Sequence, residues 1–86
     1  MYKRQSFQFK IFPNPVSAPI QIALSSQSDG EISITLLDLL GKVVLKEKRN
    51  INTGENLITL EKIEKGTYFL KLEGLGSVRT TKVISH

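Results

Sequence analysis

The chain contains no cysteine, and its single histidine is the last residue, His86. Without cysteine there is no disulfide framework, thiolate metal site, thiol nucleophile or iron–sulfur cluster. One histidine at a chain end, where fraying is the default, cannot build a Ser–His–Asp triad or a multi-histidine zinc site. We therefore expect a domain that is not an enzyme and that holds no metal or cofactor.

Long apolar runs are also missing. No segment approaches the ~18 consecutive apolar residues that a membrane-spanning helix needs. The first four residues, Met1-Tyr2-Lys3-Arg4, are basic in character, but no apolar stretch follows them. A signal peptide requires such a stretch, so the start of the chain does not encode one. The sequence predicts no membrane insertion.

The residues that are present suit one small folded domain. Of the 86 residues, 40% are hydrophobic and 23% are charged, which is ordinary for a globular chain and too apolar for a disordered one. A chain of this size buries roughly 63% of the surface that its unfolded form exposes. Twelve Lys and Arg against eight Asp and Glu leave a net charge of +4, which does not by itself indicate a polyanion binder.

Alternation of apolar and polar side chains is the strongest pattern in the chain. A period of two fits a strand with one face in the core and one face in water. The segments with this pattern or with β-rich composition are 7–11, 20–25, 32–36, 42–49, 57–60, 68–73 and 78–84. Strands spaced by roughly 8–12 residues are typical of a sandwich or barrel. The predicted fold is an all-β antiparallel sandwich with seven candidate strands.

Turn-forming residues separate these segments. Asp29-Gly30 predicts a tight hairpin turn with a positive φ at the glycine. Asp38 and Gly41 occupy the first and fourth positions of a predicted type I turn, with the glycine left-handed. Gly74-Leu75-Gly76 joins the last two predicted strands. This spacing favours consecutive hairpins, and hence antiparallel pairing in a meander.

Several polar groups could be chemical sites, but each has a simpler interpretation. The basic segment 46–49 could bind phosphates, yet Glu47 interrupts it and no aromatic ring stands beside it for base stacking. A solvated edge strand guarded by lysines explains it better. Glu61 and Glu64 are flanked by lysines, so a catalytic carboxylate pair is not expected.

Two further motifs are explained by backbone geometry. The prolines of Pro13-Asn14-Pro15 fix φ and remove two hydrogen-bond donors, which predicts a rigid corner after the first strand. In Gly66-Thr67-Tyr68 we expect the glycine to take a positive φ. The tyrosine ring should pack, and its hydroxyl should reach a backbone carbonyl.

The order of the landmarks along the chain is more specific than any one of them. An apolar-PNP motif ends at Pro15, and a strand ending in Asp38-Leu39-Leu40-Gly41-Lys42 follows. An I-x-x-G-x-Y motif ends at Tyr68, where leucine is more usual than Ile63. The last landmark is lysine followed by two apolar residues, at 82–84. In this order and spacing the chain, from about Lys10 to Ser85, resembles the type A C-terminal sorting domain of the type IX (Por) secretion system.

The resemblance implies that the fold is an Ig-like antiparallel β-sandwich of about seven strands, and that the domain directs the secretion of the protein that carries it. It implies that residues 7–86 form the sorting domain at the end of an exported protein, behind a fused cargo that these 86 residues do not include. Residues 1–6 would be a disordered leader outside the family pattern. The implied partners are the outer-membrane translocon and a surface sortase that removes the domain. The cargo would pass through the periplasm to the cell surface or the medium.

The motif positions that the resemblance carries over are Pro13, Asn14, Pro15, Gly41, Gly66, Tyr68, Lys82, Val83 and Ile84. The first six are expected to maintain the fold. The last three are the candidates for recognition, because an edge strand at a chain end can be bound by β-augmentation.

Two alternative functions remain at this point. The first is an Ig-like or fibronectin-like adhesive or spacer module, which predicts that the extreme C-terminus is dispensable. The second is a basic β-domain that binds nucleic acid, which predicts a steep loss of binding with salt. The resemblance disfavours both and implies no nucleic-acid partner.

Overall fold

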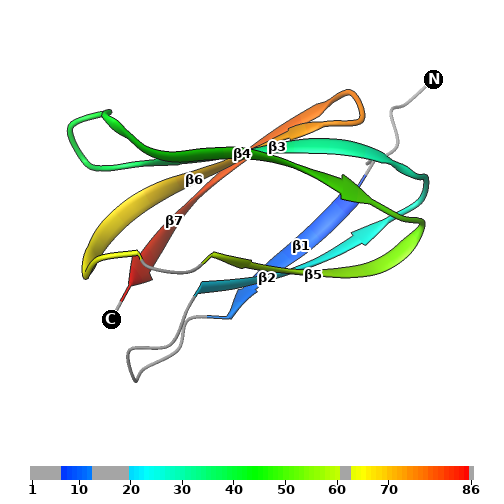
Figure 1. Cartoon of the computed structure of the whole chain (residues 1–86), viewed down its shortest axis with the longest axis horizontal. Helices are drawn as coiled ribbons and strands as arrows, with labels where there is room; N and C mark the ends of the chain where they lie inside the picture. Colours follow the sequence, from blue (N-terminus) through cyan, green and yellow to red (C-terminus); the bar gives the residue numbers. More distant parts are fainter. Residues whose placement is uncertain (1–6, 13–19, 61–62, 86) are drawn as a thin grey trace.

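The structure is a computed structural model that describes residues 7–12, 20–60 and 63–85. These residues form seven strands, shown in Figure 1. The strands are β1 (Phe7–Phe12), β2 (Ile20–Ser26), β3 (Gly30–Leu37), β4 (Val43–Ile51), β5 (Gly54–Leu60), β6 (Gly66–Gly74) and β7 (Ser77–Ser85). The prediction of an all-β, seven-stranded antiparallel sandwich is confirmed.

The strands form two antiparallel sheets that face each other as layers (Figure 1). The first sheet has the order β1-β2-β5, and the second has the order β4-β3-β6-β7. The predicted meander is wrong, because β2 pairs with β5 and β3 pairs with β6. Both of these pairings join strands that are distant in the sequence. The chain crosses between the sheets after β2, after β4 and after β5.

The core lies between the two layers and follows the alternation seen in the sequence. On β3, Ile32, Ile34 and Leu36 are completely buried, while the residues between them face outward. On β6 the same pattern buries Leu70 and Leu72. Because each sheet has one apolar face, stacking the two faces removes both from water and drives the fold.

The connection between β2 and β3 is a crossover, and not the tight hairpin that Asp29-Gly30 predicted. Gly30 does not have a positive φ; instead it begins β3. A Cβ at Gly30 would collide with the side chain of Leu75, so the glycine provides room for the β6–β7 turn. Asp29 is used differently: its Oδ1 accepts hydrogen bonds from the Thr53 backbone N–H (2.7 Å) and hydroxyl (3.0 Å). This contact joins the β2–β3 and β4–β5 crossovers at one end of the sandwich.

The two hairpins of the larger sheet both turn through residues with positive φ, and the first has the turn that was predicted for it. In the β3–β4 turn, the Gly41 N–H donates to the Asp38 carbonyl at 3.0 Å, and Gly41 has φ +87°. The Asp38 carboxylate also accepts the N–H groups of Leu40 and Lys42, each at 2.9 Å. In the β6–β7 turn, Leu75 and Gly76 have φ +53° and +80°, as a two-residue type I′ loop requires.

Candidate recognition surface

Strand β7 forms one edge of the four-stranded sheet, at the C-terminal end of the described chain. Its nine residues pair with β6 from Gly66↔Ser85 to Gly74↔Ser77. Among the described residues, no strand pairs with its other side. An edge strand presents a row of backbone N–H and C=O groups to which another chain can add. The strand on which recognition was expected therefore has the geometry that β-augmentation needs.

The three predicted recognition residues do not share one face of β7. Val83 is buried, with only 4% of its surface exposed, and packs in the core. Lys82 and Ile84 lie on the outer face of the sheet and are exposed. A partner of the folded domain can therefore touch Lys82, Ile84 and the strand edge. The Val83 side chain contributes by holding the strand in place.

The end of β7 is held by a corner at the start of β6. Gly66 has φ +152°, and a Cβ there would lie 3.4 Å from the Tyr68 hydroxyl. The buried Tyr68 ring packs in the core, and its hydroxyl donates to the Glu64 carbonyl at 2.7 Å. Ser85 on β7 donates to the Ile63 carbonyl at 3.1 Å. The positive φ and the tyrosine–carbonyl hydrogen bond predicted for this motif are both confirmed.

An open groove of about 580 Å³ separates β7 from β1, the edge strand of the smaller sheet. Phe9 and Ile11 of β1 line one side. Arg79 spans the sandwich at this groove: its guanidinium donates to the Phe7 carbonyl at 3.0 Å and lies 5.8 and 5.6 Å from the Phe7 and Phe9 ring centroids. These are hydrogen-bond and cation–π contacts that hold the two edges together without strand pairing.

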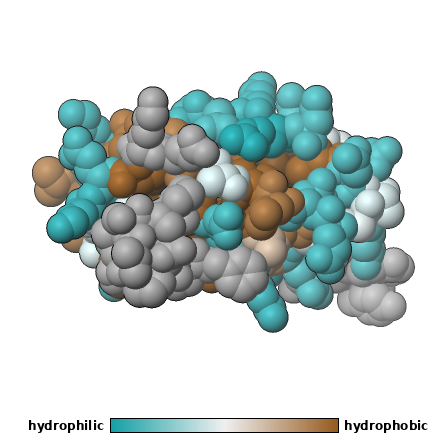
Figure 2. All heavy atoms as spheres, turned by 60° about the horizontal axis from the view of Figure 1, so that its bottom comes forward, coloured by the Kyte–Doolittle hydropathy of each residue, from teal (hydrophilic) through white to brown (hydrophobic). Residues whose placement is uncertain are grey.

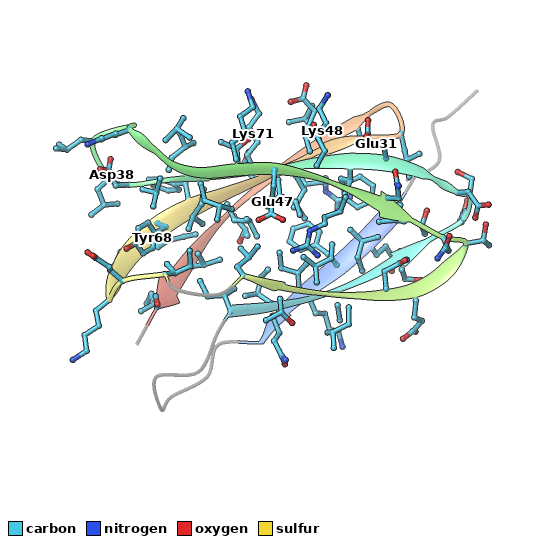
Figure 3. All side chains as sticks on the ribbon, in the orientation of Figure 1. Glu31, Asp38, Glu47, Lys48, Tyr68 and Lys71 are labelled. Atoms are coloured by element: carbon cyan, nitrogen blue, oxygen red, sulfur yellow. The ribbon has the colours of Figure 1, made fainter. Side chains whose placement is uncertain are left out.

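The opposite side of the sandwich is built differently. Strand β4 is the other edge of the larger sheet, and its Glu47 points into the space between the sheets (Figure 3). Arg49 Nε lies 2.6 Å from Glu47 Oε1 in a half-exposed ion pair. Lys48 and Lys71 instead point away from the sandwich on the outer face (Figure 3). Charges that point inward on an edge strand oppose pairing with another sheet. Segment 46–49 is thus on an edge strand, as expected, but its inward charges are Glu47 and Arg49 and not the lysines to which the guarding was assigned.

Of the remaining motif residues, Gly41 lies in the β3–β4 turn described above, and Pro13, Asn14 and Pro15 lie outside the described residues. Two features were missed from the sequence. Arg79 did not stand out, because a lone charged residue in a β-rich segment gives no sign of facing inward. The exposure of Leu39 and Leu40 was missed as well, although two leucines inside a predicted turn are a usable signal. Figure 2 shows apolar atoms projecting from the end that carries this turn in Figure 1.

Comparison with protein families now decides what this sandwich is. The family model described as "Secretion system C-terminal sorting domain" matches residues 10–86, which includes strands β2 to β7 and the second half of β1. The chain belongs to this family. A search of curated proteins gave no match. The chain is therefore a type IX secretion sorting signal, which implies interaction with the secretion machinery. A protein that carries such a signal is secreted to the cell surface or the extracellular space.

The described residues present several surface features that a partner could contact. Sorting domains are secretion signals and are not a known enzyme class. Within residues 7–12, 20–60 and 63–85 no group of three or more His, Cys, Asp or Glu is placed to hold a metal ion. A membrane-spanning helix is likewise not found in those residues. The features that remain for contact with a partner are the free edge of β7, the groove beside it and the exposed side chains of the larger sheet.

Proposed function

We propose that the domain is recognised in its folded form by the outer-membrane translocon of the type IX system and thereby carries a fused N-terminal cargo across the outer membrane. The family match over nearly the whole sandwich carries this proposal. The cargo reaches the translocon through the periplasm. A surface sortase then removes the domain. The domain itself catalyses nothing: its task is to be bound.

Strand β7 is the element through which the domain is first recognised. Its outer edge is unpaired among the described strands, and its exposed Lys82 and Ile84 offer a charge and an apolar side chain for specificity. In β-augmentation, main-chain hydrogen bonds supply the affinity and alternate side chains supply the selectivity. The Tyr68 corner and the Ser85–Ile63 hydrogen bond hold the strand rigid, which lowers the entropy cost of binding.

The proposal is tested by a secretion assay in two hosts. The 86-residue chain is fused behind a Sec signal and a fluorescent protein, then expressed in a host with a type IX system and in its translocon-null mutant. Fluorescence on the surface or in the medium of the first host, with periplasmic retention in the second, is the expected result. Retention in both hosts would contradict the sorting function and favour an adhesive or spacer module.

Removing residues 82–86 provides the second arm of the assay. This deletion takes away the exposed Lys82 and Ile84 and the last part of the β7 edge, so cargo should stay in the periplasm of both hosts. Because Val83 is part of the core, Lys82→Ala/Ile84→Ala is the matched variant that leaves the core intact. Undiminished export of both variants would refute recognition through β7.

A further inference from the structure

The end of the larger sheet that carries the β3–β4 turn presents apolar side chains to solvent. Leu40 and Leu39 in the turn are 93% and 62% exposed, and Val43 and Val44 behind them are about half exposed. We call this surface the hairpin patch. Its members are Leu37, Leu39, Leu40, Val43, Val44, Phe69 and Ile84.

Strand register makes the hairpin patch continuous across all four strands. Leu37 on β3 lies opposite Val43 on one side and Phe69 on the other. Phe69 on β6 lies one diagonal step from Ile84, because Phe69 pairs with Lys82 and Thr67 pairs with Ile84. Leu36, Tyr68 and Val83 are buried, so the residues that follow them on their strands, Leu37, Phe69 and Ile84, face outward. A continuous exposed apolar surface of this kind indicates an interaction site.

Lysines surround the hairpin patch. Lys42 lies in the turn, Lys46 and Lys71 stand on either side of Thr35, and Lys82 lies opposite Phe69. Carboxylates near the patch make contacts of their own. On the outer face, Glu73 lies 3.9 Å from the ammonium of Lys71 in an exposed ion pair. Asp38 accepts two N–H groups within its own turn, and Glu47 points between the sheets toward Arg49 (Figure 3).

The apolar side chains and the lysines around them indicate the surface chemistry that a partner needs. Resting on the proposed function, we infer that the hairpin patch docks the domain onto a protein of the secretion machinery whose surface has an apolar recess rimmed by carboxylates. Complementary charges steer such an encounter and fix its register. The exposed leucines supply the affinity when they become buried in the complex. This contact differs from augmentation of β7, which uses the backbone edge of the strand, although the two surfaces share Ile84 and meet at Lys82.

Shape favours a protein over a lipid surface. Leu39 and Leu40 lie in the turn at the end of the β3–β4 hairpin, whereas Phe69 and Ile84 lie on the outer face of the sheet. A concave protein surface contacts both together.

The test compares two leucine variants in the two-host secretion assay. Leu39→Ser/Leu40→Ser removes the projecting part of the hairpin patch, and Leu57→Ser is the matched control. Leu57 is also 62% exposed, but it lies on β5 of the other sheet. Losing two anchoring leucines should weaken docking roughly tenfold or more, with a corresponding fall in the exported fraction. Leu57→Ser should be exported like the wild type.

Charge is tested with Lys46→Glu/Lys71→Glu, which reverses two rim lysines and leaves Lys82 of the β7 edge untouched. It should also lower export, whereas Lys10→Glu on β1 should not. All variants are first checked for wild-type melting temperature as purified 86-residue chains, so that loss of export is not loss of fold. Export of the leucine and lysine variants at the wild-type level would overturn the inference.

Two measurements on the purified chain exclude the other occupants. Cosedimentation with phosphatidylglycerol vesicles that is lost in Leu39→Ser/Leu40→Ser would assign the hairpin patch to a membrane. A concentration-dependent dimer lost in the same variant would assign it to a second copy of the chain. Either result overturns the inference of a protein partner in the machinery. Failure of wild-type export would instead reject the proposed sorting function itself, so the two failures are distinguishable.

Discussion

At the scale of single residues, the Tyr68 hydroxyl makes the contact that ties the β5–β6 connection to the core. Tyr68→Phe keeps the buried ring but leaves the Glu64 carbonyl without its 2.7 Å hydrogen bond. We expect a loss of about 1 kcal/mol in the free energy of unfolding, measured by chemical denaturation. The reverse exchange, Phe69→Tyr, adds a hydroxyl to a ring that is 37% exposed on the outer face and should change stability by less than ~0.5 kcal/mol. A Tyr68→Phe variant as stable as the wild type would contradict this role.

Asp29 gives the domain an acid-sensitive contact. The hydrogen bonds from the Thr53 backbone N–H and hydroxyl lower the pKa of the Asp29 carboxyl below its ordinary value of 3.8. Because the pKa is lower in the folded state, the contact stabilises the domain fully above about pH 3.8 and is lost as the pH falls through the lowered pKa. Asp29→Asn keeps an oxygen acceptor but does not titrate.

The measurement is the melting temperature from about pH 6 to about pH 2. Asp29→Asn should remove part of the fall in melting temperature at the acid end. Thr53→Val, which keeps the N–H and removes the hydroxyl, should remove a smaller part. Identical pH profiles for all three proteins would show that the Asp29–Thr53 contact does not contribute.

At the scale of secondary-structure elements, the two edges of the larger sheet differ in how they are protected. Strand β4 carries the inward Glu47–Arg49 pair. On β7 the inward charge is Arg79, whose guanidinium contacts β1, and the inward residues nearer the C-terminal end, Thr81 and Val83, are uncharged. Replacing the pair with Glu47→Val/Arg49→Val removes the inward charges that oppose edge-to-edge pairing. We expect this variant to self-associate, as seen by light scattering at increasing concentration.

The control for this prediction is Ser33→Val/Thr35→Val. It adds the same two valines to β3, which is paired on both sides and offers no free edge. This control should remain in the wild-type association state. If both variants associated equally, added hydrophobicity would be the cause, and the guarding role of Glu47 and Arg49 would be rejected.

The strands were predictable from the sequence, while their arrangement was not. Alternation such as Ile32-Ser33-Ile34 indicates that one face of a strand is buried, and this can be predicted without knowing which strands pair. The pairing of β2 with β5 depends on contacts between residues about thirty or more positions apart, which no local pattern encodes. Gly30 shows the same limit. A side chain at this position would collide with Leu75 in the β6–β7 turn, and the sequence around Gly30 does not reveal that contact.

The candidate recognition surface was predictable to a similar extent. The family motif indicated Lys82, Val83 and Ile84, and alternation around the buried Val83 separates the three into one core residue and two exposed ones. Arg79 could not be found in this way, because its partners Phe7 and Phe9 lie on a strand at the other end of the chain.

At the scale of the whole molecule, we propose that the sorting signal is the folded sandwich, and not a linear stretch at its C-terminal end. The exposed parts of β7 and the hairpin patch come together only when β3, β4, β6 and β7 pair. A partner that needs these surfaces cannot recognise an unfolded chain. This requirement separates the account from one in which residues 82–86 act as a short peptide tag.

The most direct test is the exported fraction of one fluorescent cargo carrying either the wild-type chain or Ile34→Asp. Ile34 is completely buried in the central strand β3, so a carboxylate there should prevent folding while every residue of β7 is retained. Export is scored only where immunoblotting shows full-length fusion protein. The account predicts export of the wild-type fusion and periplasmic retention of Ile34→Asp. Equal export of both, with Ile34→Asp shown to be unfolded, would contradict it.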